Sequence, residues 1–240
     1  MSRPTGKLFG WMLAAVVIAG FSTLGVWQLG RAKQKEAMLV TSQQVLAERK
    51  ALPLSAASDP ARRESYDWAA GEGRFLDTPA ILLDNQTRAS QPGIRVYRVF
   101  QPAVESAPLL VELGWLPLPG DRRMPSVALP SGALAVSGLL VAPPSAGIAT
   151  PVATPQADGN LLMIGLDHAV LSAALDMPTL APRVLKLDPA LPLGYTRDLD
   201  ILPNTLPPER HLGYAVQWFG LALAVFITAL LLTLRTRRQR

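Results

Sequence analysis

Four side chains with hydrogen-bonding or metal-binding capacity open a long apolar stretch near the end of the chain. His211, Tyr214, Gln217 and Trp218 lie in the first third of residues 211–234, which contain no charged residue and no proline. Leucine or valine would enter a membrane more readily at these positions, so the polar groups need a structural or a functional reason. The imidazole of His211 can ligate a metal such as haem iron.

On a helix, His211, Tyr214 and Trp218 share one face with Ala215 and Ala222, whereas Gln217 points elsewhere. Histidine, tyrosine and tryptophan are also typical of the headgroup zone of a membrane. That interpretation explains Tyr214 and Trp218 well. It explains Gln217 less well, because an amide in lipid needs a hydrogen-bond partner.

A matching group of residues ends another apolar stretch, residues 8–30. Trp27 and Gln28 lie at its end, and Arg31 follows it. If both stretches cross the bilayer, in opposite directions, these residues reach the depth of His211 in the same leaflet. Two interpretations follow. The polar groups can join the helices, with Gln28 bonded to Gln217. Alternatively, they can enclose a flat apolar ligand such as haem, with His211 on the iron and Arg31 at a propionate.

Both apolar stretches are long enough to cross a bilayer as helices. A cleaved signal peptide is the alternative for residues 8–30, but their length favours a retained anchor. Basic residues follow the second stretch at once, which predicts that both termini are cytoplasmic. The predicted segments are a cytoplasmic N-terminus (1–7), a transmembrane helix (8–30), a helical extension (31–50), an extracytoplasmic β-rich domain (51–210), a second transmembrane helix (211–234) and a cytoplasmic basic tail (235–240).

Charge and composition exclude several classes of function. The formal net charge of +5 comes from the two ends, because residues 31–210 hold 17 lysines and arginines against 18 acidic residues. The basic excess is therefore a signal of membrane topology, and we expect no nucleic-acid partner. The absence of cysteine excludes disulfides and thiolate metal sites, and two histidines are too few for an all-histidine centre.

Proline divides the rest of the chain into short strands. All prolines but Pro4 lie between Pro53 and Pro208, and the first proline-free window predicts a helix that continues towards Lys50. Asp167 is expected to cap a short helix that ends near Asp176. Strands are expected at Asp67–Phe75, Ala80–Asp84, Ile94–Phe100, Leu109–Trp115, Leu134–Val141, Leu161–Leu166 and Val184–Leu187. This pattern predicts an antiparallel, β-rich α+β domain, which can be open or curled into a barrel, with residues 117–130 and 142–160 as loops.

No motif of a hydrolase, nucleotide-binding protein or zinc protease is present, so we expect no enzymatic activity. His168 follows the predicted cap Asp167 and is expected to be an exposed residue in the first turn of a short helix.

Several segments resemble the surfeit locus protein 1 family. Leu24–Lys35 (LGVWQLGRAKQK) and His211–Ala222 (HLGYAVQWFGLA) are similar to the two end motifs of that family. The segments LLDNQTRASQPGIRVYRVFQP, LLVELGWLP and PRVLKLD follow the family's order between them. The resemblance covers nearly the whole chain. One difference is clear: the family usually has Asn-Arg-Gly-Trp where this chain has Glu112-Leu113-Gly114-Trp115, which leaves the role of that arginine open here.

The resemblance implies an assembly factor for a haem-copper terminal oxidase of the respiratory chain. Such a protein would bind haem a as a transient cargo in the bacterial inner membrane, with residues 31–210 in the periplasm. The resemblance assigns the iron to His211. Its partners would be the catalytic oxidase subunit and the machinery of haem a synthesis, with membrane lipid around both helices. The alternative is a membrane-anchored scaffold that stabilises an oxidase intermediate without touching haem.

Overall fold

The computed structural model describes residues 4–145, 147, 150–202 and 205–238. The outermost residues of the two predicted cytoplasmic ends, 1–3 and 239–240, lie outside these ranges. The chain forms two compact units: Met1–Val40 with Thr205–Arg240, and Thr41–Asn204. Each unit is described by itself.

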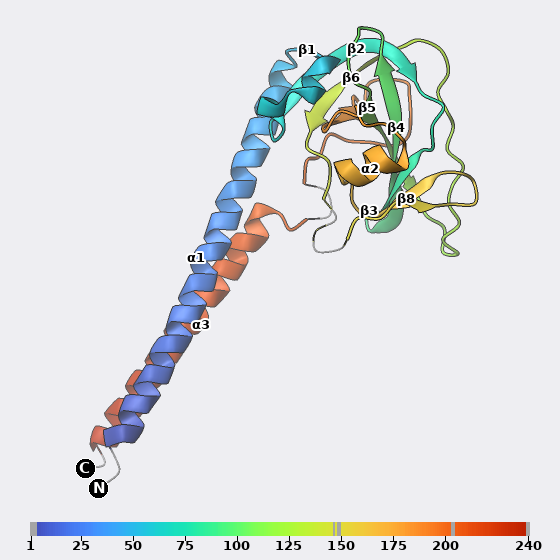
Figure 1. Ribbon diagram of the computed structural model, residues 1–240. Helices are drawn as coiled ribbons and strands as arrows, with labels where there is room; N and C mark the ends of the chain where they lie inside the picture. Colours follow the sequence, from blue (N-terminus) through green and yellow to red (C-terminus); the bar gives the residue numbers. More distant parts are fainter. Residues whose placement is uncertain (1–3, 146, 148–149, 203–204, 239–240) are drawn as a thin grey trace. The chain divides into compact units, whose positions relative to one another are not determined.

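The first unit is a pair of antiparallel helices. Helices α1 (Pro4–Glu48) and α3 (Pro208–Arg238) lie side by side, with the start of α1 next to the end of α3 (Figure 1). Both are long and apolar enough to cross a membrane. Each begins with a proline, whose fixed φ suits the first helical position. Helix α1 ends two residues before the predicted Lys50, because Arg49 adopts a left-handed φ of 43°.

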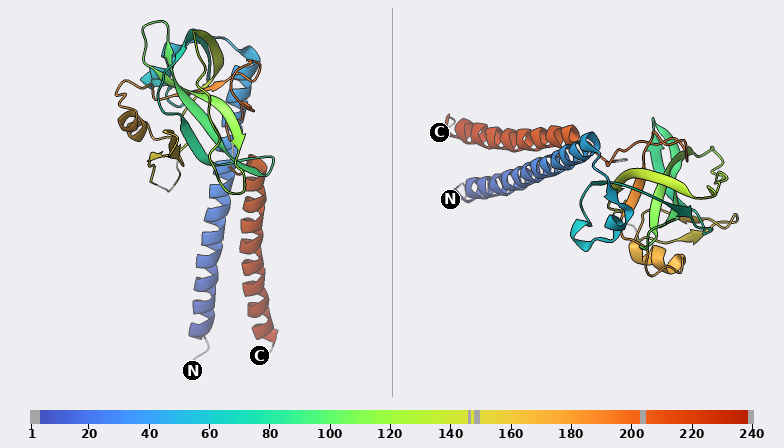
Figure 2. Two further views of the ribbon diagram at one scale, coloured as in Figure 1. Left: turned by 90° about the vertical axis from the view of Figure 1, so that its right-hand side faces the viewer. Right: turned by 90° about the horizontal axis from the view of Figure 1, so that it is seen from above.

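Small residues fill the contact between the two helices. Ala14 and Ala32 of α1 and Ala215 and Ala222 of α3 are all buried. Longer side chains bridge the two helices, from the contact of Trp11 with Phe226 to that of Phe21 with Trp218. Figure 2 shows the two helices running alongside each other.

The second unit is built around a closed five-stranded barrel. Its strands pair in the cyclic order β2–β6–β9–β5–β4, and β4 returns to β2 at Phe75, which is the register partner of Phe100. A closed barrel leaves none of these strands with a fully unpaired edge. The five strands are β2 (Asp67–Phe75), β4 (Gln91–Pro102), β5 (Leu109–Pro117), β6 (Leu134–Val141) and β9 (Val184–Leu187).

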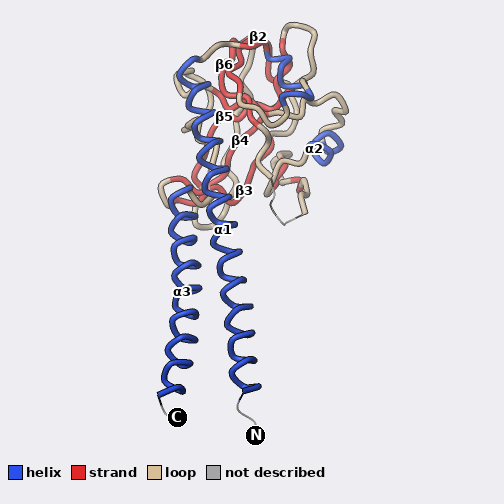
Figure 3. Tube along the Cα trace, turned by 90° about the vertical axis from the view of Figure 1, so that its left-hand side faces the viewer, coloured by secondary structure: helices blue, strands red, loops and turns tan. Residues whose placement is uncertain are grey.

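Further strands extend this sheet beyond the barrel (Figure 3). β3 pairs with the long strand β4, β8 with β3, and β7 with β8, while β1 pairs with β2 on the other side. Two short 3-10 helices, Leu54–Ser58 and Pro60–Arg62, separate β1 from β2. The bounds are β1 (Leu52–Pro53), β3 (Ile81–Arg88), β7 (Thr154–Pro155) and β8 (Leu161–Met163).

The predicted fold class is confirmed, and the sheet proves to be mixed. Three strand pairs, β1–β2, β3–β8 and β5–β9, are parallel, and the other six are antiparallel. The prediction missed the two-residue strands β1 and β7 and placed the end of β8 three residues too far along the chain. Helix α2 (His168–Ala174) begins after the predicted cap, because the Asp167 carboxylate accepts the N–H of Val170.

Alternation along the strands gives the domain two apolar layers. On β5, Val111 and Leu113 belong to the cluster inside the barrel, whereas Leu110 belongs to a second cluster on the outer side, which includes Leu171 of α2. Leu113 is only 1% exposed. Leu113, where this chain differs from the family that it resembles, is therefore part of the barrel interior.

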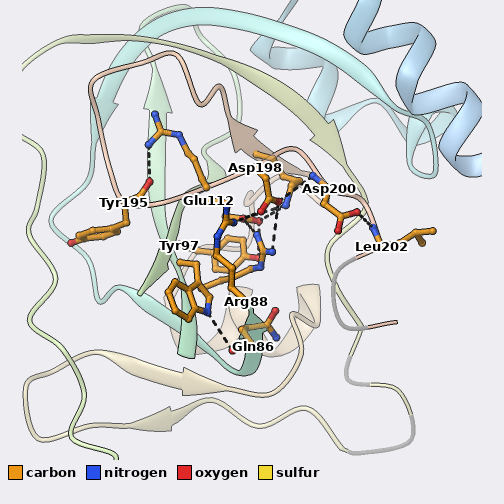
Figure 4. A network of polar contacts seen from close by, with 12 residues as sticks. Gln86, Arg88, Tyr97, Glu112, Tyr195, Asp198, Asp200 and Leu202 are labelled. Atoms are coloured by element: carbon orange, nitrogen blue, oxygen red, sulfur yellow. Dashed lines mark hydrogen bonds and ion pairs between the residues drawn. The ribbon is translucent and has the colours of Figure 1, made fainter. Parts of the chain in front are cut away.

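A charged cluster lies on the outer face of the same strands (Figure 4). Glu112 of β5 forms ion pairs with Arg95 of β4 and with Lys186 of β9, at 3.1 Å from Nζ to Oε2 for the lysine. The hydroxyl of Tyr97 donates to the same carboxylate at 3.1 Å. Asp198, in the segment after β9, forms an ion pair with Arg88 and lies 3.9 Å from Arg95. The cluster thus joins four strands, β3, β4, β5 and β9, and the segment that leads towards α3.

Burial alone would raise the pKa of Glu112, but Lys186 and Arg95 outweigh burial and hold that pKa below its usual value of 4.5. Burial and the Glu112 carboxylate together raise the pKa of Tyr97. Glu112 is therefore ionised and Tyr97 neutral at neutral pH. Because the folded-state pKa of Glu112 is depressed, its contribution to stability is fully present above pH 4.5 and is lost as pH falls through the lowered value.

We predict that Leu113→Arg lowers the free energy of unfolding by more than about 4 kcal/mol, because it places a guanidinium without a counter-ion inside the barrel. Leu113→Met, which nearly conserves volume, should cost less than about 1.5 kcal/mol. Urea unfolding of the full chain in detergent, followed by tryptophan fluorescence, measures both. Equal stability of Leu113→Arg and the parent protein would contradict the buried position.

We also predict that Glu112→Gln lowers the free energy of unfolding by about 3–5 kcal/mol at pH 7, since it removes the ion-pair partner of buried Lys186 and leaves buried Arg95 with Asp198 at 3.9 Å. Exposed Glu105 provides the control, and Glu105→Gln should change stability by less than about 0.5 kcal/mol. In titrations from pH 7 to pH 3, Glu112→Gln should lose less stability below pH 4.5 than the parent protein. Identical acid profiles would rule out a depressed pKa at Glu112.

Candidate functional site

A hydrogen bond between His211 and Gln28 joins the two helices near the start of α3. Nδ1 of His211 lies 2.7 Å from Oε1 of Gln28. His211 is the fourth residue of α3 and is 7% exposed. Two predicted site residues that are 183 positions apart in sequence are thus brought into direct contact.

The hydrogen bond to Gln28 determines which imidazole nitrogen of His211 carries the proton. A carbonyl oxygen can only accept, so Nδ1–H of His211 donates to Oε1 of Gln28. Nε2 then holds a lone pair, and it is a buried atom without a hydrogen-bond partner among the described residues. A neutral imidazole with one nitrogen hydrogen-bonded and the other unprotonated is the usual state of a histidine that ligates a metal.

Aromatic side chains pack the helices on the next two turns. The ring of Trp218 lies 5.5 Å from that of Phe21 between centroids. A Cβ added at Gly25 would lie 2.7 Å from Cζ of Phe219, so the glycine makes room for this ring. Trp218, which was predicted to be a site residue, therefore serves the helix contact in this arrangement. Phe21 and Phe219 were not predicted.

The predicted bond between Gln28 and Gln217 is wrong, because Gln28 bonds to His211 and Gln217 is exposed. Tyr214 is 39% exposed, although it was expected to share the face of His211. Trp27 is 55% exposed on α1. The site therefore has two parts: an inner pair, His211 and Gln28, and an outer group of exposed side chains on both helices.

Cationic groups surround this end of the helix pair. Nη1 of Arg31 donates to Oε1 of Gln34 at 2.9 Å, and its side chain is exposed. Nζ of Lys35 donates to the carbonyl oxygen of Leu206, just before α3. The sequence analysis did not single out Lys35, although it lies four residues after Arg31 and so on the same side of α1. Both cations are available to an anionic group at this end of the pair.

Elsewhere, the structure corrects the prediction made for His168. His168 is half-buried rather than exposed, and its Nε2 donates to the carbonyl oxygen of Leu180 at 2.6 Å. Among the described residues, no group of three or more histidine, aspartate or glutamate side chains is arranged to hold a metal ion. A metal at His211 would therefore have to bring its other ligands with it, as haem iron does.

Comparison with models of known protein families gives one match. The model described as the SURF1 family matches residues 15–223, which include His211, Gln28, the barrel and the first half of α3. No curated protein matches the chain.

We predict that Gly25→Leu disturbs the helix pair, because its side chain would overlap the ring of Phe219, and contact distances between carbon atoms are about 3.5–4.0 Å. The helices should part by about 1 Å or more near this level. The chain contains no cysteine, so spin labels at Val26→Cys and Val216→Cys, which are exposed and lie within one turn of Gly25 and Phe219, report this distance in nanodiscs by pulsed electron paramagnetic resonance.

Gly20→Leu is the matched control, because no atom lies within 4 Å of a Cβ built at Gly20, and it should leave the distance distribution unchanged. Adding Phe219→Ala to Gly25→Leu removes the overlapping ring and should restore the parent distribution. The packing described here would be refuted by three indistinguishable distributions for the parent, Gly20→Leu and Gly25→Leu.

Proposed function

The chain belongs to the SURF1 family, a membrane protein family known for oxidase assembly factors, and on this premise we propose that it carries haem a transiently to the catalytic subunit of a haem-copper oxidase. His211 would supply the iron ligand through Nε2. The observation that supports this role most strongly is the buried, unpartnered Nε2 of His211, opposite the bonded Nδ1.

Gln28 would act as a positioning residue for this ligand. Its carbonyl oxygen keeps the proton on Nδ1 of His211 and fixes the plane of the ring. Arg31 and Lys35 lie close enough along α1 to pair with the propionates, whose carboxylates suit guanidinium and ammonium groups. Trp27 and Tyr214 offer exposed aromatic surface for a porphyrin edge.

Burial of Nε2 is consistent with a transient cargo. Haem iron would reach this nitrogen only after the side chains around it had moved apart, and the free energy of that opening would lower the affinity. Re-closure of the helix pair would favour release. A single protein ligand to the iron would also favour release, because a second strong ligand would raise the affinity and retain the haem.

We also propose the orientation of the two helices in the membrane. Four arginines, Arg235, Arg237, Arg238 and Arg240, follow the apolar part of α3. They would lie in the cytoplasm of a bacterium, together with the N-terminus, so that His211 lies at the periplasmic side of the inner membrane. The supply of haem a would come from its synthesis machinery in the same membrane.

A scaffold without haem is the second candidate, and one observation favours it. The bond from His211 to Gln28 already satisfies both side chains at Nδ1 and Oε1, and it joins two membrane helices. In that case His211 would stabilise the hairpin, and the barrel would hold an oxidase intermediate through surface contacts.

We predict that His211→Ala purified from cells that make haem a loses at least nine-tenths of its bound haem a. Gln28→Leu should weaken haem a binding about 10–100-fold, as loss of a group that orients a metal ligand does. Absorbance of the Soret band on titration with haem a measures both variants, and circular dichroism checks that the helices persist.

His168→Ala is the control, because His168 lies on α2 of the barrel unit and should leave haem a affinity unchanged. Haem a content of His211→Ala equal to that of the parent would exclude the ligand role. The scaffold would be favoured if such a variant also supported normal oxidase yield in cells, whereas low yield with retained haem would assign His211 to the helix contact.

A further inference from the structure

An apolar groove runs between α1 and α3. It begins about ten residues after His211 on α3 and lies opposite the N-terminal part of α1. It has a volume of about 580 Å³, and its walls include Leu13 and Val17 of α1 and Leu221, Ala224 and Thr228 of α3. This volume lies in the range of about 300–1,000 Å³ in which proteins hold small organic ligands. Both walls belong to the helix unit.

The polar groups in the groove are already bonded within the protein. The indole N–H of Trp11 donates to Oγ of Thr233 at 3.0 Å, and the Thr233 hydroxyl donates to the carbonyl oxygen of Ala229 at 2.8 Å. The Thr228 hydroxyl donates to the carbonyl oxygen of Ala224, also at 2.8 Å. None of the described residues that line the groove is charged. Among the described residues, its walls therefore offer apolar contact and favour a hydrocarbon chain.

The groove continues the outer part of the candidate site. On α3, Tyr214, Gln217, Leu221, Ala224 and Thr228 follow one another at intervals of three or four residues and so share one side of the helix. The last three of them line the groove. The exposed side chains of Tyr214 and Gln217 therefore lie on the same side of α3 as the groove.

Helix α1 has the same arrangement in the opposite chain direction. Leu13, Val17, Leu24, Trp27 and Arg31 lie along one side of the helix at intervals of three, four or seven residues. Leu13 and Val17 line the groove, and Leu24 and Trp27 are 40% and 55% exposed. One flank of the helix pair thus carries the aromatic and polar groups near His211 and, beyond them, the apolar groove.

Resting on the haem-carrying function, we propose that this groove holds the farnesyl tail of haem a and lets the protein select haems that have such a tail. Leu221 lies ten residues after His211, about 15 Å along α3. A farnesyl chain that begins at the edge of a porphyrin near His211 spans this distance. The ring would rest at Trp27 and Tyr214, and the tail would leave the bilayer lipid for the groove.

The test fills the groove and compares two haems. Ala224→Leu adds bulk to an exposed wall of the groove, away from the buried contact residues of α3. Ala15→Leu is the matched control, because Ala15 is exposed on α1 and does not line the groove. Each full-length variant in nanodiscs is titrated with haem a and with haem b, which has no farnesyl tail, by Soret absorbance.

We expect the parent protein and Ala15→Leu to bind haem a at least tenfold more tightly than haem b. Ala224→Leu should lose most of this preference, with its haem b affinity within twofold of the parent. Retained haem b binding shows that the variant is folded. Equal affinities of the parent for both haems, or an unchanged preference in Ala224→Leu, would overturn the proposal.

A second measurement tests the groove without haem. A photoreactive farnesol should label groove residues in the parent and in Ala15→Leu, but not in Ala224→Leu, and a photoreactive phospholipid should label them weakly. Equal labelling by both probes would make the groove a general lipid crevice and overturn the proposal. If neither haem binds the parent, the haem-carrying function fails by itself, and farnesol labelling still decides what the groove accepts.

Discussion

The hydrogen bond from His211 to Gln28 is the interaction on which the chemistry of the helix pair depends. It places the proton on Nδ1, leaves Nε2 as a free base and holds the imidazole between two membrane helices. Without this bond, the two tautomers of the neutral ring would compete, and the ring would be free to rotate towards lipid. The same contact helps to set the register of α1 against α3, so ligand geometry and helix packing are properties of one contact.

The site residues could be predicted from the sequence, but the way in which they pair across the two helices could not. Both end motifs were recognisable because polar and aromatic residues are unusual in otherwise apolar spans. Their pairing was predicted wrongly, since two glutamines can bond to each other in principle and the sequence contains no direct information on register. One signal was overlooked. Phe21 precedes Gln28 by seven residues and Trp218 follows His211 by seven, so the two pairs meet at successive levels of antiparallel helices.

In the barrel unit too, the bounds of individual strands could be predicted from local sequence, whereas the pairing of distant strands could not. The bounds of β2, β6 and β9 match the prediction, because proline and glycine clusters delimit these strands clearly. The closing pair β2–β4 and the three parallel pairs join segments whose proximity no local pattern reveals. Glu112 illustrates the limit: in sequence it is one acidic residue among apolar neighbours. Only the alignment of three strands shows that it is buried between Arg95 and Lys186.

The place of β9 in the barrel has a consequence for biogenesis. This strand lies between β5 and β6, yet it is the last of the barrel strands to be synthesised. Until Val184–Leu187 have emerged, β5 and β6 each expose an unpaired edge, and such edges are prone to pair with other chains. Closure also requires contacts between distant parts of the chain, which slows folding. The domain therefore passes through an open, association-prone state for most of its translation, and it reaches its protected form only shortly before α3 is made.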